Sequence, residues 1–303
     1  MNHLITILGP TATGKTMLAA NLASLISGEI ISADSRQIYR RMDIGTGKDL
    51  GDYVVDGKHI PYHLIDIADP GFRYNVFEFL NDFSDTFYKV AEAGNIPILC
   101  GGSGMYLDAV LRGYQMSNAP VNNELRKLLE ELSHAELVSK LATYGPLHNI
   151  SDISESERLI RAIEIADFQV KYKDLSLNLP DFTPINFGIF FERKIIRYRI
   201  TERLEARINK GLVSEVEALI ESGIKPENLI YYGLEYKFVT LFVTGQLSFE
   251  SMFTQLNTAI HQFAKRQMTW YRRMEKNGVK IHWIDGSIDL ADKLAVILSR
   301  INF

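Results

Sequence analysis

Short apolar runs alternate with stretches of helical apolar spacing over the first hundred residues. The apolar runs are bounded by glycine, proline and polar residues, as buried strands are. Four of them predict strands, at residues 4–8, 29–34, 63–67 and 96–100. Residues 17–26 and 77–91 between them have the spacing of helices, and Gly94 follows as a stop signal. Strands that alternate with helices predict an α/β fold with a parallel sheet.

The pattern becomes almost wholly helical after Gly113. Helices are predicted at residues 122–132 and 134–144, and a third runs through 159–165 behind Ser154 and Glu157 in capping-box spacing. A strand pattern returns at 187–191, so the helical block is predicted to be an insertion into one sheet. The predicted domains are a catalytic core of residues 1–115 and 180–303 and an inserted helical domain of residues 116–179.

The last third of the core is predicted to be helical from Arg193 to about residue 222, where Gly223 follows. A strand at 279–284 and a helix at 288–301 end the chain. Arg199, Arg203 and Arg207 lie four residues apart and therefore share one helix face. Residues 193–210 carry a local charge of +5, and residues 265–276 carry +4 with two aromatic residues interleaved. Two such stripes favour a polyanionic partner.

Composition narrows the class of protein. The chain has 303 residues, 46% hydrophobic and 23% charged, which is ordinary for a globular protein with one large core or a core and a smaller domain. A net charge of -4 means that any contact with nucleic acid must be local. The single cysteine, Cys100, excludes an internal disulfide and a cysteine-rich zinc module. Without a signal-like leader or an apolar run of about 18 residues, we expect a cytoplasmic protein with no membrane partner.

The clearest motif lies between the first predicted strand and helix. It matches G-x-x-x-x-G-K-[ST], a loop whose backbone N–H groups surround phosphate oxygens. Lys15 would neutralise the outer phosphate and Thr16 could hold Mg²⁺. The residues predicted to bind a diphosphate are Gly9, Pro10, Thr11, Ala12, Thr13, Gly14, Lys15 and Thr16.

Two polar residues follow predicted strands directly. Asp34 ends the second strand, and Ser103 lies in a glycine turn after the strand at 96–100. If the sheet is parallel, both lie beside the phosphate loop, because ligands bind at the carboxyl ends of such strands. These residues alone fit a kinase or an NTPase at least as well, since Asp34 or Asp66 could be the carboxylate that holds magnesium in such a protein.

Six segments, spread in order over nearly the whole chain, carry a more specific resemblance. They are Gly-Pro-Thr-x-x-Gly-Lys-Thr at 9–16, Asp-Ser-Arg-Gln-Ile-Tyr at 34–39, Met-Asp-Ile-Gly-Thr-Gly-Lys at 42–48, Gly-Gly-Ser-Gly-Met-Tyr-Leu at 101–107, Arg-Leu-Ile-Arg-Ala-Ile-Glu at 158–164 and Lys-Arg-Gln-x-x-Trp at 265–270. Together they resemble the bacterial tRNA dimethylallyltransferases, also called tRNA isopentenyltransferases, of the IPP transferase family.

The resemblance implies a P-loop NTPase-like sheet that catalyses prenyl transfer. The donor would be dimethylallyl diphosphate, and the acceptor would be the exocyclic amino group of the adenosine 3′-adjacent to the anticodon. Mg²⁺ would be the cofactor, and the tRNA anticodon stem-loop would be the macromolecular partner. The enzyme is expected to be a monomer. Asp34, Arg203 and Ser103 would be catalytic, with Asp34 as the carboxylate that takes the amino proton. The predicted tRNA-binding residues are Asp34, Ser35, Arg36, Gln37, Ser103, Glu157, Arg158, Leu159, Ile160, Arg161, Lys265, Arg266 and Gln267.

The inserted domain resembles the mobile domain with which this family closes on the anticodon stem. The target base would have to be flipped out of its stack, and Arg36 and Tyr39 are candidates to stack in the vacated space. The chain departs from the family pattern at several places: it has Ser103 for threonine, Asp49 for proline, Ser154-Glu155 for Asn-Asp and Gly-Leu-Glu-Tyr at 233–236 for Gly-Tyr-x-Glu.

Three alternatives remain open at this point. A small-molecule kinase would turn over ATP without tRNA. An adenylate isopentenyltransferase would take a free adenosine nucleotide, and the helical insertion and the basic stripe at 265–276 argue against it. A nucleic-acid-binding switch without transfer chemistry would leave Asp34 without a purpose.

Overall fold

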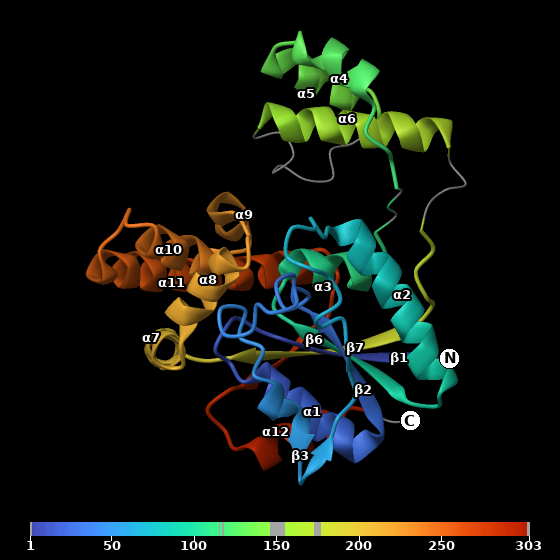
Figure 1. Cartoon of the computed structure of the whole chain (residues 1–303). Coiled ribbons are helices and arrows are strands. Elements are labelled where there is room, and N and C mark those ends of the chain that lie inside the picture. The colour runs from blue at the N-terminus through green and yellow to red at the C-terminus, as the bar shows by residue number, and fades with distance from the viewer. Residues whose placement is uncertain (1, 115, 117, 146–154, 173–176, 302–303) are drawn as a thin grey trace. The chain divides into compact units, whose positions relative to one another are not determined.

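The central sheet consists of parallel strands in the order β5-β2-β6-β1-β7-β8 (Figure 1). The computed structural model describes residues 2–114, 116, 118–145, 155–172 and 177–301. Its strands are β1 His3–Leu8, β2 Gly28–Ala33, β3 Val54–Val55, β4 Lys58–His59, β5 Tyr62–His63, β6 Ile96–Gly101, β7 Thr183–Phe190 and β8 His282–Asp285. β1 lies between β6 and β7, and its apolar residues are buried, as is typical of a parallel strand covered on both faces.

Helices cover both faces of the sheet. In Figure 1, α1 and α12 lie on one face and α2 and α3 on the other. The helices of the core are α1 Lys15–Ile26, α2 Val76–Glu92, α3 Gly104–Leu111, α7 Arg193–Asn209, α8 Leu212–Glu221, α9 Pro226–Tyr231, α10 Leu234–Val243, α11 Phe249–Lys276 and α12 Leu290–Leu298, with the 3₁₀ turn η1 Leu50–Tyr53. The predicted α/β fold, a parallel sheet flanked by helices, is confirmed.

Local signals in the sequence explain several of these ends. The α2 helix begins with a capping box in which Asn75 accepts from the backbone N–H of Glu78, and the Glu78 side chain accepts from the N–H of Asn75. Two residues after α2, Gly94 has φ +79°, a left-handed conformation that suits glycine. The predicted helix at 77–91 therefore agrees with α2 to within a residue at each end.

The predicted strand at 63–67 is wrong for most of its length, because β5 contains only Tyr62–His63. Leu64 and Asp66 have φ values of +61° and +56°, which no strand residue adopts. The chain turns here, and Asp66 forms an ion pair with the buried side chain of Lys48. A polar contact across the fold thus overrides the local apolar pattern.

The predicted helix from Arg193 to residue 222 is two helices. Gly211, with φ +106°, separates α7 from α8 and turns the chain. Both helices pack with α9, α10 and α11 around a second apolar core, whose fully buried members include Tyr236, Val239 and Leu256. Side chains of this bundle lie close to the loops that follow the carboxyl ends of the sheet strands.

Two further boundaries differ from their predictions. β7 begins four residues earlier than predicted and includes Pro184, which pairs with Leu4 of β1. β8 joins β7 only from Phe187 on, so the missing N–H of Pro184 faces no neighbouring strand. At the end of the chain β8 and α12 are shorter than the predicted segments 279–284 and 288–301.

The chain divides into two compact units, residues 1–113 with 179–303 and residues 114–178. The second unit contains α4 Asn123–Glu130, α5 His134–Ala142 and α6 Ser156–Lys171, which pack around Leu129, Leu159 and Ile163. Ser154 of the predicted capping box lies outside the described residues, and Glu155 is the N-cap of α6. No described helix is both long enough and apolar enough to cross a bilayer.

Candidate active site

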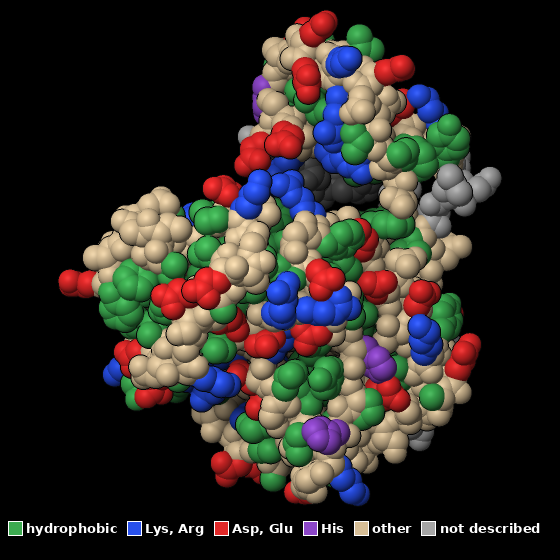
Figure 2. Space-filling view, viewed as in Figure 1, with side chains coloured by type: hydrophobic (Ala, Val, Ile, Leu, Met, Phe, Trp, Pro, Cys, Tyr) green, Lys and Arg blue, Asp and Glu red, His purple; other side chains and the backbone are tan. Residues whose placement is uncertain are grey.

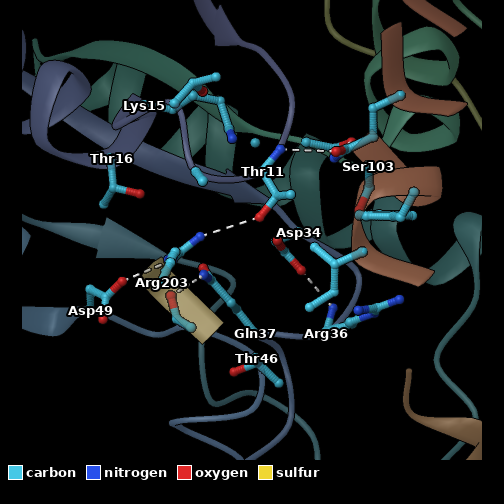
Figure 3. Close-up of a pocket in the computed structure, with 18 of the residues that line it drawn as sticks. Thr11, Lys15, Thr16, Asp34, Arg36, Gln37, Thr46, Asp49, Ser103 and Arg203 are labelled. Carbon is cyan, nitrogen blue, oxygen red and sulfur yellow. Dashed lines mark hydrogen bonds and ion pairs between the residues drawn. The ribbon is translucent and has the colours of Figure 1, made fainter. Parts of the chain in front are cut away.

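The carboxyl ends of β1, β2 and β6 open onto one pocket of about 740 Å³. Parallel strands end at the same edge, so the loops that follow them meet there. The lining includes the P-loop, the Asp34 loop, the Ser103 turn and side chains from α7 and α11 (Figure 3). A pocket of this size suits a small-molecule ligand.

The P-loop has the tight backbone that the motif predicts. Gly14 and Ala12 have φ values of +78° and +64°, and the Thr13 hydroxyl donates to the Pro10 carbonyl at 2.9 Å. Gly9 lies so close to β7 that a Cβ there would be 2.6 Å from the carbonyl oxygen of Ile189. The loop therefore keeps its shape through internal contacts and has short side chains where a ligand would approach.

Lys15 is half-buried at the base of the loop, and its ammonium donates to the Pro10 carbonyl at 2.8 Å. The pKa of Lys15 is lowered to about 8, mainly by burial and also by the nearby charge of Arg203, while Cys100 and Asp34 act in the opposite direction. A diphosphate bound here would favour the protonated lysine. The electrostatics of the loop thus suit an anion.

Asp34 follows β2 and faces the P-loop across the pocket (Figure 3). One carboxylate oxygen accepts from the backbone N–H of Arg36 at 2.9 Å, which forms a short turn. Within the part of the chain that the structure describes, the other oxygen has no hydrogen bond. Asp34 is therefore both a turn residue and a carboxylate with an oxygen available to a ligand.

The Ser103 turn joins the Asp34 loop. The Ser103 hydroxyl accepts from the backbone N–H of Ser35 at 3.0 Å and lies 3.2 Å from the Ser35 hydroxyl. The parallel sheet thus places Ser103 beside Asp34, as the sequence predicts for such a sheet. Gln37 donates to the carbonyl of Gly47 at 3.0 Å, so it connects this loop to the glycine loop at 42–48.

Arg199, Arg203 and Arg207 of α7 line the pocket from one face of the helix. Arg199 donates to the Ala12 carbonyl at 2.9 Å, and Arg203 donates to the Thr11 hydroxyl at 3.3 Å. Arg207 is almost fully buried, and burial lowers its pKa, followed in effect by the charge of Arg203. The face predicted from the four-residue spacing thus supplies the positive side of the pocket.

A buried carboxylate, Glu235, balances part of this charge. It forms ion pairs with Arg207 at 3.2 Å and with Arg36 at 3.1 Å. The Arg36 guanidinium also lies 5.1 Å from the ring centroid of Phe263, a cation–π contact at the edge of the pocket. Arg36 thus lines the pocket and is held in place, while Tyr39 is buried against Tyr232 and does not line the pocket. The predicted stacking of either residue on a base stays a prediction.

The α11 helix supports the P-loop from behind through two polar residues one turn apart. Gln267 accepts from the backbone N–H of Thr11 at 2.9 Å and donates to the carbonyl of Gly102 at 2.8 Å. The Tyr271 hydroxyl contacts the carbonyls of Gly9 and Gly102 at 3.0 and 3.2 Å. The Gln267 amide is thus buried on the chain's own backbone at the wall of the pocket, and its predicted tRNA contact stays a prediction.

The glycine loop at 42–48 forms another wall of the pocket. Glu215 of α8 accepts from the backbone N–H groups of Asp43, Ile44 and Gly45 at 2.9, 2.7 and 3.0 Å. It also accepts from the Tyr236 hydroxyl at 2.6 Å. The roles of Glu215, of Arg199 as a site residue and of Tyr271 were not predicted, because a supporting contact between residues so far apart in the sequence leaves no local pattern.

The predicted tRNA residues of the second unit have unequal exposure. Glu157 and Arg158 are exposed on α6, while Leu159 and Ile160 are buried in the core of that unit. The predicted tRNA contacts of these four residues stay predictions. Arg161 donates to the Ala119 carbonyl at 2.6 Å and pairs with the buried Glu164 at 3.2 Å. Its position indicates that it holds the chain segment that leads into α4.

The basic stripe of α11 is exposed at Lys265, Arg266 and Arg272. On the face of the core in Figure 2, lysine and arginine gather in small groups beside aspartate and glutamate, as expected for a chain with a net charge of -4. Arg266 also lies over the Phe263 ring at 5.9 Å. Positive charge is therefore local, and Arg266 of this stripe also lines the pocket.

Comparison with known proteins shows which family this chain resembles. The model of the family described as IPP transferase matches residues 37–274, and that described as isopentenyl transferase matches residues 2–60. The chain is 53% identical over 303 residues to tRNA dimethylallyltransferase 1 of Parabacteroides distasonis, covering 99% of this chain and 98% of that protein. It is 54% identical over 302 residues to tRNA dimethylallyltransferase 2 of Phocaeicola vulgatus, covering 99% and 97%.

Solved structures give the same picture. The tRNA isopentenylpyrophosphate transferase of Bacillus halodurans aligns with a TM-score of 0.71 at 29% identity, covering 99% of this chain and 95% of that one. A eukaryotic dimethylallyltransferase acting on tRNA aligns with a TM-score of 0.76 at 21% identity, covering 99% and 78%, and so supports the fold. With a family model matched over most of its length and relatives of more than 50% identity, the chain belongs to the IPP transferase family.

Proposed function

We propose that this enzyme transfers a dimethylallyl group from dimethylallyl diphosphate to the exocyclic amino group of the adenosine 3′-adjacent to the anticodon in tRNA, with release of diphosphate. The observation that carries the proposal is the meeting of the P-loop, Asp34 and Arg203 around one pocket. It is supported by membership of the IPP transferase family and by relatives named tRNA dimethylallyltransferase.

The diphosphate of the donor fits the P-loop end of the pocket. Backbone N–H groups of residues 11–16 and the positive end of α1 would bind its oxygens, with Lys15 and Arg203 as charged donors. These groups also stabilise the negative charge that grows on the diphosphate as its bond to the prenyl carbon breaks. Lys15 and Arg203 repel each other, and the fold compensates for this repulsion before the substrate binds, because Arg203 is already hydrogen-bonded to Thr11.

Asp34 fits the role of general base. As the amino nitrogen forms its bond to the first prenyl carbon, the bond from that carbon to the diphosphate oxygen breaks, and the surplus amino proton passes to the carboxylate. The oxygen of Asp34 that is not engaged with Arg36 lies on the pocket side. Ser103, 3.0 Å from the Ser35 backbone, holds the Asp34 loop and has a hydroxyl for the leaving oxygens.

Magnesium fits the donor set at the P-loop. Thr16 lines the pocket with a hydroxyl, and Mg²⁺ usually takes one or two protein oxygens together with phosphate oxygens and water. No group of three or more acidic, histidine or cysteine residues that could hold a metal occurs among the described residues. Thr16 would thus hold the ion together with the substrate, and the ion would supply charge neutralisation for the leaving diphosphate.

The acceptor adenosine would have to leave its stack to reach this pocket, which costs a few kcal/mol. Arg36 beside Phe263 and the exposed Lys265 and Arg266 of α11 are placed to contact RNA near the pocket. In the second unit, Glu157, Arg158 and the Glu164-bound Arg161 are the residues for the anticodon stem. These contacts would offset the cost of flipping.

Mass spectrometry of tRNA nucleosides tests the proposal. After incubation of purified enzyme with tRNA, dimethylallyl diphosphate and Mg²⁺, we expect one prenylated adenosine per substrate tRNA, at the position 3′ of the anticodon. Adenosine monophosphate offered instead of tRNA should remain unmodified. Prenylation of the free nucleotide, or ATP turnover without tRNA, would favour one of the two alternative enzymes.

A further inference from the structure

Arg203 is held between the P-loop and a carboxylate. Its guanidinium donates through Nη1 to the Thr11 hydroxyl at 3.3 Å and through Nη2 to the Asp49 carboxylate at 2.9 Å (Figure 3). Thr11 is held in turn by Gln267. The charge that is expected to bind the donor therefore already has an anionic partner within the chain.

The other two cations at the P-loop differ in this respect. Lys15 rests on the carbonyl of Pro10 at 2.8 Å, and Arg199 rests on the carbonyl of Ala12 at 2.9 Å. Both acceptors are neutral carbonyls, so a diphosphate that displaces them competes with a hydrogen bond in which only the donor is charged. At Arg203 it competes with an ion pair in which donor and acceptor are both charged.

The local structure presents Asp49 to Arg203 in a fixed way. Asp49 is the N-cap residue of the η1 turn, and about half of its side chain is exposed. Gly47, two residues earlier, has no room for a side chain, since a Cβ there would clash with Nη2 of Arg207 and lie 2.8 Å from Nη2 of Arg203. The backbone of the glycine loop thus packs on the guanidinium groups of both arginines, and Asp49 follows two residues later at Arg203.

A second carboxylate, Asp52, lies in the same turn and also lines the pocket. Burial raises the pKa of Asp52, the charge of Asp49 raises it further, and Arg203 opposes both. The carboxylates of Asp49 and Asp52 thus both interact electrostatically with the positive charge of Arg203. A bound diphosphate would be a third anion close to the same guanidinium.

We propose that Asp49 is an internal counter-ion that competes with diphosphate for Arg203. In the free enzyme the Asp49 carboxylate accepts the hydrogen bond from Nη2 of Arg203, and the diphosphate of the donor replaces this carboxylate when it binds. After transfer, Asp49 draws Arg203 back and so lowers the affinity for the diphosphate product. The proposal rests on the proposed function for the identity of donor and product, and it makes Asp49 a positioning residue that limits product retention.

Calorimetric binding of inorganic pyrophosphate with Mg²⁺ measures this competition directly. For Asp49→Asn we expect binding about three- to tenfold tighter than in the wild type, because the Arg203 guanidinium is freed from its carboxylate partner. Asp56→Asn is the matched control: it removes the same charge from an exposed turn whose φ of +49° suits asparagine, and its affinity should stay within twofold of the wild type.

The same substitution in an Arg203→Ala background separates competition from a general effect of charge. There, Asp49→Asn should change the pyrophosphate affinity less than twofold, since no guanidinium remains to be released. Inhibition of transfer by added pyrophosphate should increase in Asp49→Asn in proportion to its binding. A larger kcat with the same product affinity would not fit the proposal.

Three results would overturn the idea. One is weaker pyrophosphate binding in Asp49→Asn, which would mean that Asp49 holds Arg203 in its binding position. The second is an unchanged affinity, and the third is a gain that persists without Arg203. Pyrophosphate binding needs no tRNA, so these results are independent of the transfer assay, whose failure in the wild type would instead contradict the proposed function.

Discussion

The Asp34 carboxylate has two roles: it stabilises a turn, and it is the proposed general base of the reaction. One oxygen accepts from the Arg36 backbone at 2.9 Å, which sets the turn after β2, and Figure 3 shows the other on the side of the P-loop. A carboxylate has lone pairs enough for both tasks. The turn orients the base, since it fixes the rotation of the carboxylate toward the pocket.

Asp34→Asn separates the two tasks. Asparagine can still accept from the Arg36 N–H, so the turn should persist, but it cannot take the amino proton. We expect the single-turnover transfer rate to fall by ~10²–10⁴-fold with little change in the dissociation constants of tRNA and donor. A rate within about threefold of the wild type at saturating substrates would show that Asp34 is not the essential base.

The pKa of Lys15, lowered mainly by burial to about 8, predicts a pH dependence of donor binding. The diphosphate prefers the protonated lysine, so the bound state has the higher pKa and donor binding takes up a proton above pH 8. We expect the donor dissociation constant to be flat below about pH 8 and to rise by up to tenfold per pH unit above it. Binding measured by calorimetry between pH 6.5 and 9.5 checks this.

Lys15→Arg is the control for that titration. Arginine stays charged over the whole range, so its donor affinity, whatever its absolute value, should lose the rise above pH 8. For the folded protein alone the sign is opposite: a lysine with a lowered pKa contributes more stability as pH rises from about 8 toward 10.5. A rise in the dissociation constant that persists in Lys15→Arg would assign the titration to another group.

Among the elements, α11 has the most varied contacts. It is 28 residues long and therefore spans about 42 Å. Its buried face holds the P-loop and the Ser103 turn through Gln267 and Tyr271, while Trp270 packs on Gly104, where a Cβ would lie 2.5 Å from the indole. Its exposed face carries the basic stripe. One helix thus supports the donor loop and offers positive charge to solvent.

Gln267→Met tests the support of the P-loop. Methionine has a similar length but leaves the Thr11 N–H and a hydrogen bond of the Gly102 carbonyl unsatisfied. We expect the free energy of unfolding to fall by about 1–3 kcal/mol and donor affinity to weaken. Thr269→Ala, on the exposed side of the same helix, should change neither quantity measurably. Equal stability of the two variants in urea unfolding would contradict the role of Gln267.

Local patterns predicted most elements of this fold and the parts of the site that follow strands. The P-loop, Asp34, Ser103 and the arginine face of α7 all have signals within one helix or one strand and its turn. The false strand at 63–67 came from an apolar run that the Lys48–Asp66 contact bends. Glu215 and Gln267 act on loops far away in the sequence, and their roles depend on tertiary packing that no local pattern records.

For the whole molecule, the net charge of -4 makes tRNA binding depend on local basic groups. Lys265 and Arg272 are exposed on α11 and are candidates for phosphate contacts. Replacing both with alanine should reduce the slope of log affinity against log salt by up to about one unit for each lost phosphate contact. Fluorescence binding of tRNA between 50 and 300 mM salt measures the slope.

A matched pair of surface lysines controls for charge alone. Lys58 and Lys89 are exposed on β4 and α2, and alanine at both should leave the salt slope unchanged. Donor affinity should be normal in both double variants, because none of the four residues lines the pocket. A slope that stays the same in the Lys265/Arg272 variant would remove this stripe from the tRNA-binding surface.

The second unit interrupts the core between α3 and β7, that is, after β6 and before β7 in the chain. In the sheet those two strands flank β1, which carries the P-loop. An insertion that begins and ends on a hydrogen-bonded framework can change in length or surface without shifting the register that holds Lys15 opposite Asp34. Under the proposed role of the second unit in RNA binding, selection can therefore alter which RNA is recognised while the reaction itself is inherited unchanged.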